Sequence, residues 1–167
     1  MIKRNVFENP GWYTSYTPYQ PEIAQGRLEA LMNYQTMVSD LTGMDISNAS
    51  LLDEPTSAAE AMMLAKRVAK SKSNTFFVNS KTFKQTIAII KSRAKPLGVE
   101  IEIGDRPDKG KEYFAAYFQY PNAEGSIEDL ESVTKDIQAK GGLMIIGTDL
   151  LALTLLKTPG DFGADIA

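Results

Sequence analysis

The sequence contains neither cysteine nor histidine, and each absence excludes a class of chemistry. Without cysteine there is no disulfide and no thiolate nucleophile, which is compatible with a reducing compartment and favours the cytoplasm as the location. Without histidine the chain lacks the commonest general base and neutral metal ligand, so serine-type triads and zinc sites are excluded. An oxygen-only magnesium or calcium site built from Asp53, Glu54 and Glu60 does not match the spacing of a known binding loop, so we expect no metal site.

A strong charge of one sign and a long apolar run are also missing. The chain carries 18 basic and 21 acidic side chains, for a formal net charge of −3. This balance gives no electrostatic footprint for nucleic acid or an anionic membrane. No apolar run is long enough to span a bilayer, and the first residues resemble neither a signal peptide nor a transit sequence. We therefore expect a soluble protein that binds neither nucleic acid nor membranes.

The pattern of apolar residues after position 20 alternates between helical and strand spacing. A chain of 167 residues with 43% hydrophobic residues can build one buried core, so we expect a single α/β domain over residues 21–167. Ser57 and Glu60 have the spacing of a capping box at the start of the second helix. Helices are predicted over 21–42, 56–69, 83–96 and 127–139, and strands over 75–79, 99–103, 113–120 and 143–147. Alternating elements of this kind predict right-handed βαβ units and a mostly parallel sheet of about four strands with flanking helices.

The first twenty residues combine prolines with aromatic side chains, a composition that opposes both a helix and a central strand. We expect residues 1–20 to form an extended arm. Aromatic side chains on such an arm bury area only by docking, either on their own domain or on another chain. The candidate interface residues are Trp12, Tyr13, Tyr16 and Tyr19.

Three stretches resemble the amino-terminal half of glycine decarboxylase, the P-protein of the glycine cleavage system. They read GWYTSYTPYQPEIAQGRLEALMNYQTMVSDLTGMDISNASLLDE, QTIAIIKSRA and TDLLALTLLKTPGDFGADI. The resemblance implies a fold type I enzyme dependent on pyridoxal phosphate (PLP), which decarboxylates glycine and passes the aminomethyl group to a lipoyl-carrying H-protein. In that family PLP is the electron sink, and its Schiff-base lysine lies in the carboxy-terminal half. No lysine here lies in a segment resembling that motif, so we expect a truncated homologue that is not catalytic alone.

Three positions match places where the resemblance implies contact with PLP. The family has Asp-Glu-Gly-Thr at a helix start; residues 53–56 here read Asp-Glu-Pro-Thr, which keeps Thr56 but loses a backbone donor at Pro55. The family commonly has His-Pro-Gln-Thr after the first strand; here Phe83 replaces the histidine, so it could stack on the ring but not exchange a proton. Asp149 matches the carboxylate that faces the pyridine nitrogen, although an aspartate at a strand end also suits a helix cap.

These departures leave Thr56, Phe83 and Asp149 as vestigial cofactor candidates, with the alternative that this half never binds PLP. Residues 163–167 resemble the start of a further strand, so the sheet is expected to stop early. The strand at 75–79 is then expected either to re-pair inside a smaller four-stranded sheet or to be completed by a second chain.

The expected partners are a second copy of this chain or another decarboxylase chain, with the lipoyl H-protein as a further candidate. A different function also remains open, in which the aromatic arm docks on the complete decarboxylase or its partners and alters their activity. A small-molecule site in the sheet crevice is a third alternative.

Overall fold

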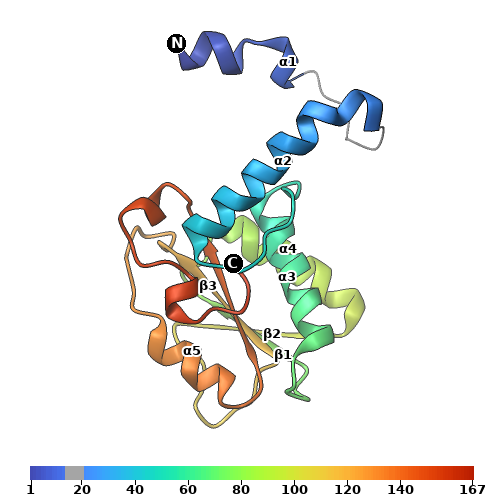
Figure 1. The fold of residues 1–167 in the computed structure, drawn as a ribbon. Coiled ribbons are helices and arrows are strands. Elements are labelled where there is room, and N and C mark those ends of the chain that lie inside the picture. The colour runs from blue at the N-terminus through green and yellow to red at the C-terminus, as the bar shows by residue number, and fades with distance from the viewer. Residues whose placement is uncertain (14–20) are drawn as a thin grey trace.

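The core of the molecule is one parallel sheet of four strands in the order β2-β1-β3-β4 (Figure 1). This computed structural model describes residues 1–13 and 21–167. The strands are β1 (Thr75–Asn79), β2 (Glu100–Gly104), β3 (Ala115–Tyr120) and β4 (Leu143–Thr148). The predicted α/β fold with a four-stranded parallel sheet is confirmed.

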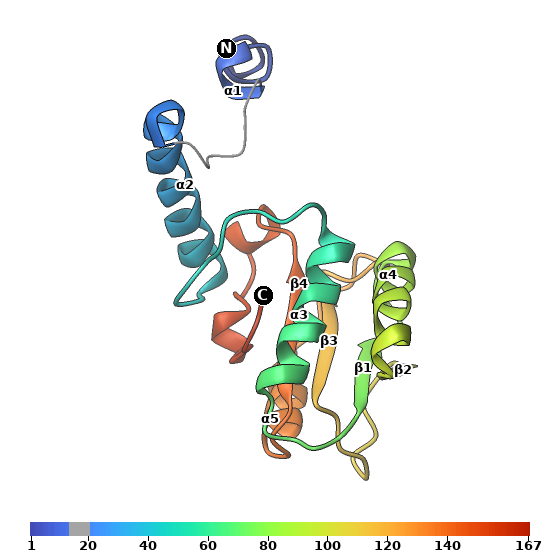
Figure 2. The same cartoon turned by 90° about the vertical axis from the view of Figure 1, so that its right-hand side faces the viewer.

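Helices cover both faces of the sheet, as parallel strands require. One face packs against α3 (Glu54–Val68) and α4 (Lys84–Ala94), with Phe76, Val78 and Tyr117 in the shared core. The other face packs against α5 (Glu131–Gln138) and the segment 150–164, around Phe77 and Phe118 (Figure 2). The helix predicted from residue 127 begins only at 131, where Asp129 Oδ1 accepts a hydrogen bond from the Glu131 amide at 3.0 Å.

Strand β1 lies inside the sheet rather than at its edge. All five of its residues pair with β2, and residues 76–78 also pair with β3. The first of the two expected outcomes is therefore confirmed, because β1 is paired within a four-stranded sheet. The strand expected at 163–167 amounts to one bridge between Ile145 and Ile166, beside β4.

Most of the described amino-terminal residues are helical, so the expectation of an extended arm is wrong for that part. Lys3–Phe7 form a short π-helix and Pro10–Tyr13 form α1. Pro10 is the first residue of α1, where its fixed φ suits a helix and its missing N–H is not needed. The docking predicted for Tyr16 and Tyr19 lies outside the described residues. The division into an arm of residues 1–20 and a domain of residues 21–167 stays a prediction.

Helix α2 (Pro21–Thr42) was predicted with these bounds and projects away from the sheet (Figures 1 and 2). Its carboxyl end is anchored where Gly43 has φ +68°. A Cβ at Gly160 would overlap the Gly43 backbone, so two glycines allow the segment 158–160 to approach the end of α2. Within the described part of the chain, no helix is long and apolar enough to cross a membrane.

Candidate functional site

Parallel α/β sheets bind ligands at the carboxyl ends of their strands. Here that edge contains the ends of β1, β3 and β4. Because α3 and α4 run antiparallel to the strands they cover, both helices begin at this edge, beneath the linker from α2 (Figure 2). We call this region the carboxyl edge. It contains Thr56, Phe83 and Asp149, so all three cofactor candidates lie at the same end of the strands.

The start of α3 is capped by its own carboxylate. Asp53 Oδ1 accepts a hydrogen bond from the Thr56 amide at 2.8 Å, and the Ser57 hydroxyl donates to the Asp53 carbonyl at 2.8 Å. Hydrogen bonds from the Thr56 side chain and amide lower the pKa of Asp53. The capping box predicted for Ser57 and Glu60 is therefore wrong, since the N-cap lies four residues before Ser57. The Thr56 amide, which a phosphate would need, is already used.

The loop after β1 is fixed by polar contacts to the end of β2. The Asn79 amide group donates to the Asp105 carbonyl at 3.0 Å and accepts from the Lys81 amide at 2.9 Å, and the Ser80 hydroxyl bonds to the Asp105 carboxylate. Phe83 follows at the N-cap position of α4, half-buried, and provides no side-chain cap. Its predicted role of stacking on a cofactor ring stays a prediction.

Asp149 follows β4 and is exposed. Its Oδ1 accepts a hydrogen bond from the Leu151 amide at 3.0 Å, and its carbonyl accepts from the Leu153 amide. This bond spans two residues and precedes the 3-10 turn of residues 152–154, whose N-cap is Leu151 and has no side-chain cap bond.

A row of polar side chains that sequence reasoning missed crosses the carboxyl edge. The Tyr117 hydroxyl donates to Gln119 Oε1 at 2.9 Å, and Glu54 at the start of α3 is exposed. Partial burial raises the pKa of Glu54, an effect that the Gln119 side chain opposes. Burial, then the Glu54 charge, also raises the pKa of Tyr117. A Cβ at Gly147 would overlap the Tyr117 hydroxyl, so glycine is needed there.

Three threonine hydroxyls at this edge are buried without a hydrogen-bond partner among the described residues. They belong to Thr82 in the loop after β1, Thr86 in the first turn of α4 and Thr148 at the end of β4. Thr82 is 2% exposed and Thr86 is 0% exposed. Leaving a buried hydroxyl unpaired costs about 1–3 kcal/mol, so these groups are exceptions to the usual pairing of buried polar atoms.

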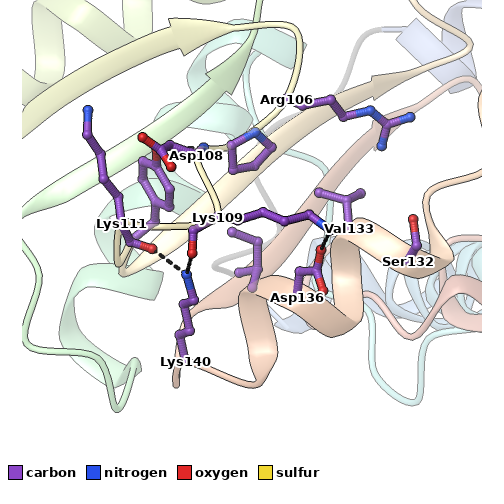
Figure 3. Close-up of a pocket in the computed structure, with 11 residues that line it drawn as sticks. Arg106, Asp108, Lys109, Lys111, Ser132, Val133, Asp136 and Lys140 are labelled. Carbon is purple, nitrogen blue, oxygen red and sulfur yellow. Dashed lines mark hydrogen bonds and ion pairs between the residues drawn. The ribbon is translucent and has the colours of Figure 1, made fainter.

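A cavity of about 260 Å³ lies on the other side of the molecule, between the loop 105–111 and α5 (Figure 3). Four cations line it, and each has an acidic or carbonyl partner. Lys140 Nζ donates to the carbonyls of Lys109 at 2.5 Å and Lys111 at 2.8 Å. The remaining pairs are Lys109 with Asp136 at 3.6 Å, Lys111 with Glu102 at 3.0 Å and Arg106 with Glu128 at 3.1 Å. The cations around the cavity are therefore paired within the fold, and they stabilise it more than they offer a site for an anion.

The carboxyl edge does not fit PLP as it stands. A phosphate at the start of α3 would meet two carboxylates, a proline without N–H and an amide bonded to Asp53. Lys81, in the loop after β1, is paired with Glu124 at 3.4 Å and Glu128 at 3.9 Å. Its ammonium group therefore already has two carboxylate partners within the fold. No group of three or more acidic residues among those described could hold a metal ion.

Comparison with known sequences places the whole chain in one family. A family model described as glycine cleavage system P-protein matches residues 1–167. Glycine dehydrogenase (decarboxylating) of Teredinibacter turnerae is 57% identical over 170 residues, covering 99% of this chain. The enzyme of the same name from Rhodopseudomonas palustris is 56% identical over 169 residues, covering 100%. The chain spans only 18% of the length of either relative.

Solved structures agree with this assignment. A crystal structure of glycine decarboxylase (P-protein) of the glycine cleavage system, in inhibitor-bound form, superposes with a TM-score of 0.84 at 32% identity, covering 95% of this chain and 37% of that chain. A putative O-acetylhomoserine (thiol)-lyase from Campylobacter jejuni, determined with a pyridoxyl-lysine monophosphate residue, gives a TM-score of 0.62 at 16% identity, covering 91% and 42%. The second match shows the fold alone, that of fold type I PLP-dependent enzymes. The chain therefore belongs to the P-protein family of the glycine cleavage system.

Proposed function

We propose that this chain supplies an amino-terminal α/β unit of a glycine decarboxylase and does not catalyse the reaction by itself. The observation that carries the proposal is the occupied start of α3, where Asp53 already holds the Thr56 amide at 2.8 Å. The family match over all residues and the 18% share of the relatives' length support it. In this proposal the lysine and the phosphate site belong to a part of the enzyme outside this chain.

PLP, where the complete enzyme binds it, supplies an electron sink for decarboxylation. We derive no step through PLP from this chain, because its carboxyl edge does not fit the group. We propose that this chain instead packs against the cofactor-carrying part and helps to exclude water from its reaction centre, which strengthens electrostatic interactions there.

The exposed apolar residues of the projecting helix support docking on another polypeptide. Met32 and Met37 of α2 are more than half exposed, as are Ile2 and Phe7 near the amino terminus. We propose that the partner is another part of a decarboxylase, in the same chain or in a second copy. The lipoyl H-protein is a further candidate. Trp12, Tyr13, Tyr16 and Tyr19 stay candidate interface residues, and the cytoplasmic location stays a prediction.

The proposal is tested with the isolated chain and with a chimera. The isolated chain, mixed with PLP and glycine, is expected to release no carbon dioxide above a protein-free control. The chimera replaces the matching 170 residues of the Teredinibacter turnerae relative with this chain, and we expect it to retain glycine-dependent release. Release by the isolated chain, or an inactive but folded chimera, would contradict the proposal.

A further inference from the structure

The start of α4 has no cap, in contrast to the start of α3. Its N-cap residue is Phe83, which forms no side-chain cap bond, and its first turn contains no acidic residue. The first backbone hydrogen bond of the helix runs from the Ile87 amide to the Phe83 carbonyl at 3.0 Å. The amides of residues 84–86 precede this bond and have no acceptor among the described residues. Three backbone donors are therefore unpaired at the positive end of an 11-residue helix.

Two buried hydroxyls beside these amides also have no partner among the described residues. Thr86, the third residue of α4, is 0% exposed, and Thr82, in the bend before the helix, is 2% exposed. A helical side chain leans toward the amino end of its helix, so the Thr86 side chain is directed to the unpaired amides. Thr134 in α5 shows the usual arrangement, because its hydroxyl donates to the Leu130 carbonyl four residues earlier at 2.8 Å. Thr86 forms no such bond, since Phe83 has an extended ψ of 136° and turns Thr82 out of the helical path.

The charges near the start of α4 favour an anion. Lys84, the first residue of the helix, is exposed and forms no ion pair or hydrogen bond with another described residue. Lys81, in the loop before the helix, pairs with the carboxylates of Glu124 at 3.4 Å and Glu128 at 3.9 Å. An anion at the start of α4 would therefore meet a lysine that has no carboxylate partner in the described part of the chain.

We infer that the start of α4 binds a single oxyanion of the size of phosphate, through the amides of residues 84–86, the hydroxyls of Thr82 and Thr86, and the charge of Lys84. Free N–H groups and the helix dipole both favour an anion at such a helix start. The ligand is a small one, because both hydroxyls are enclosed by the fold. The site differs from the start of α3, where the resemblance implies the PLP phosphate, and it does not depend on the proposed function.

The test measures binding of inorganic phosphate to the chain of 167 residues at constant ionic strength. Binding is measured rather than the unfolding temperature, because phosphate stabilises folded proteins in general by exclusion from their surface. Titration calorimetry gives the Kd, and amide NMR spectra show which residues respond. We expect the amides of residues 84–86 to shift and those of residues 54–56, at the start of α3, to stay in place. Chloride at the same ionic strength is expected to shift neither group.

Substitutions separate the hydroxyl and the lysine from general effects on the fold. Thr86→Val is expected to raise the Kd for phosphate at least about tenfold without lowering the urea concentration at which the chain unfolds. Thr148→Val is the matched control, because its hydroxyl is also buried and unpaired among the described residues. It follows Ile146 by two positions in β4 and so shares that residue's α5 side of the sheet. Lys84→Gln is expected to raise the Kd about threefold, and Lys91→Gln, in the last turn of α4, to leave it unchanged.

Two results would overturn the inference. One is the absence of phosphate binding, or binding in which the amides of residues 84–86 do not shift. The other is an equal Kd for Thr86→Val and Thr148→Val, which would show that the Thr86 hydroxyl takes no part in binding. Neither result bears on the proposed function, which is decided by carbon dioxide release from the chimera.

Discussion

The α5 face pairs the cations around its cavity, whereas the carboxyl edge leaves three of its buried hydroxyls unpaired among the described residues. Around the cavity beside α5, the cations of Lys140, Lys109 and Arg106 all have carboxylate or carbonyl partners. At the carboxyl edge Glu54 has no cationic partner among the described residues, and three threonine hydroxyls have no hydrogen-bond partner there. Paired polar groups stabilise the fold, whereas a buried hydroxyl without a partner costs stability in the isolated chain. The predictions below test this difference.

The largest effect on the free energy of unfolding is expected from a substitution at Gly147, beside the Tyr117 hydroxyl. Gly147→Ala places a Cβ on the Tyr117 hydroxyl and near Gln119, so strand β4 or the tyrosine must move. We expect a loss of about 2–3 kcal/mol in the free energy of unfolding, measured by urea denaturation. Gly26→Ala in α2, where nothing lies within 4 Å of the added Cβ, is the control and is expected to be neutral or slightly stabilising. Equal effects of the two changes would show that the tyrosine has room to move.

This row of side chains also shows what the sequence could and could not reveal. The strand TFFVN and helix α2 were predicted with their observed bounds, because periodicity and flanking glycines are local signals. Gln119 is a polar residue within an apolar strand, which the sequence alone could have marked as unusual. Its interaction with Glu54 could not be predicted in this way, because the two residues are 65 positions apart. The order of strands has the same difficulty, because pairing of β1 with both β2 and β3 depends on distant segments.

The predicted capping box at the start of α3 was wrong for a different reason. Asp53 and Ser57 are both favourable N-cap residues, so residue type alone could not choose between them. The geometry decides for Asp53, which bonds the Thr56 amide. The structure places the three candidates at the carboxyl edge, and their role in a cofactor site stays a prediction. The use of the donors there within the fold could be learned only from atomic contacts.

Valine substitutions at two buried threonines are expected to have smaller effects on the free energy of unfolding, and the two effects are expected to have opposite signs. The Thr86 hydroxyl, at the carboxyl edge, lacks a partner among the described residues, whereas the Thr134 hydroxyl on the α5 face donates to the Leu130 carbonyl at 2.8 Å. Thr86→Val is expected to raise the free energy of unfolding by up to about 1 kcal/mol, and Thr134→Val to lower it by about 1 kcal/mol. Urea denaturation of both variants checks the pair. A loss for Thr86→Val equal to that for Thr134→Val would mean that its hydroxyl is satisfied.

The smallest and most specific effect concerns the pH dependence of two glutamates. Hydrogen bonds from Lys135 and Lys157 lower the pKa of Glu131 to about 2, whereas burial raises the pKa of Glu54. A lowered folded-state pKa gives stability that is present above the unfolded pKa, near 4.5, and is lost as the pH falls toward 2. A raised folded-state pKa has the reverse consequence, because the folded chain then binds the proton more readily than the unfolded chain. Stability relative to the glutamine variant therefore rises as the pH falls through the folded pKa of Glu54.

The measurement compares the unfolding free energies of the unsubstituted chain, Glu54→Gln and Glu131→Gln between about pH 3 and pH 7, using urea at each pH. On acidification, the unsubstituted chain should lose stability relative to Glu131→Gln and gain stability relative to Glu54→Gln. Two differences that change in the same direction would remove the contrast between the regions. Opposite slopes would instead identify Glu54 as a carboxylate that the isolated fold leaves without a cation, because a paired carboxylate would follow Glu131.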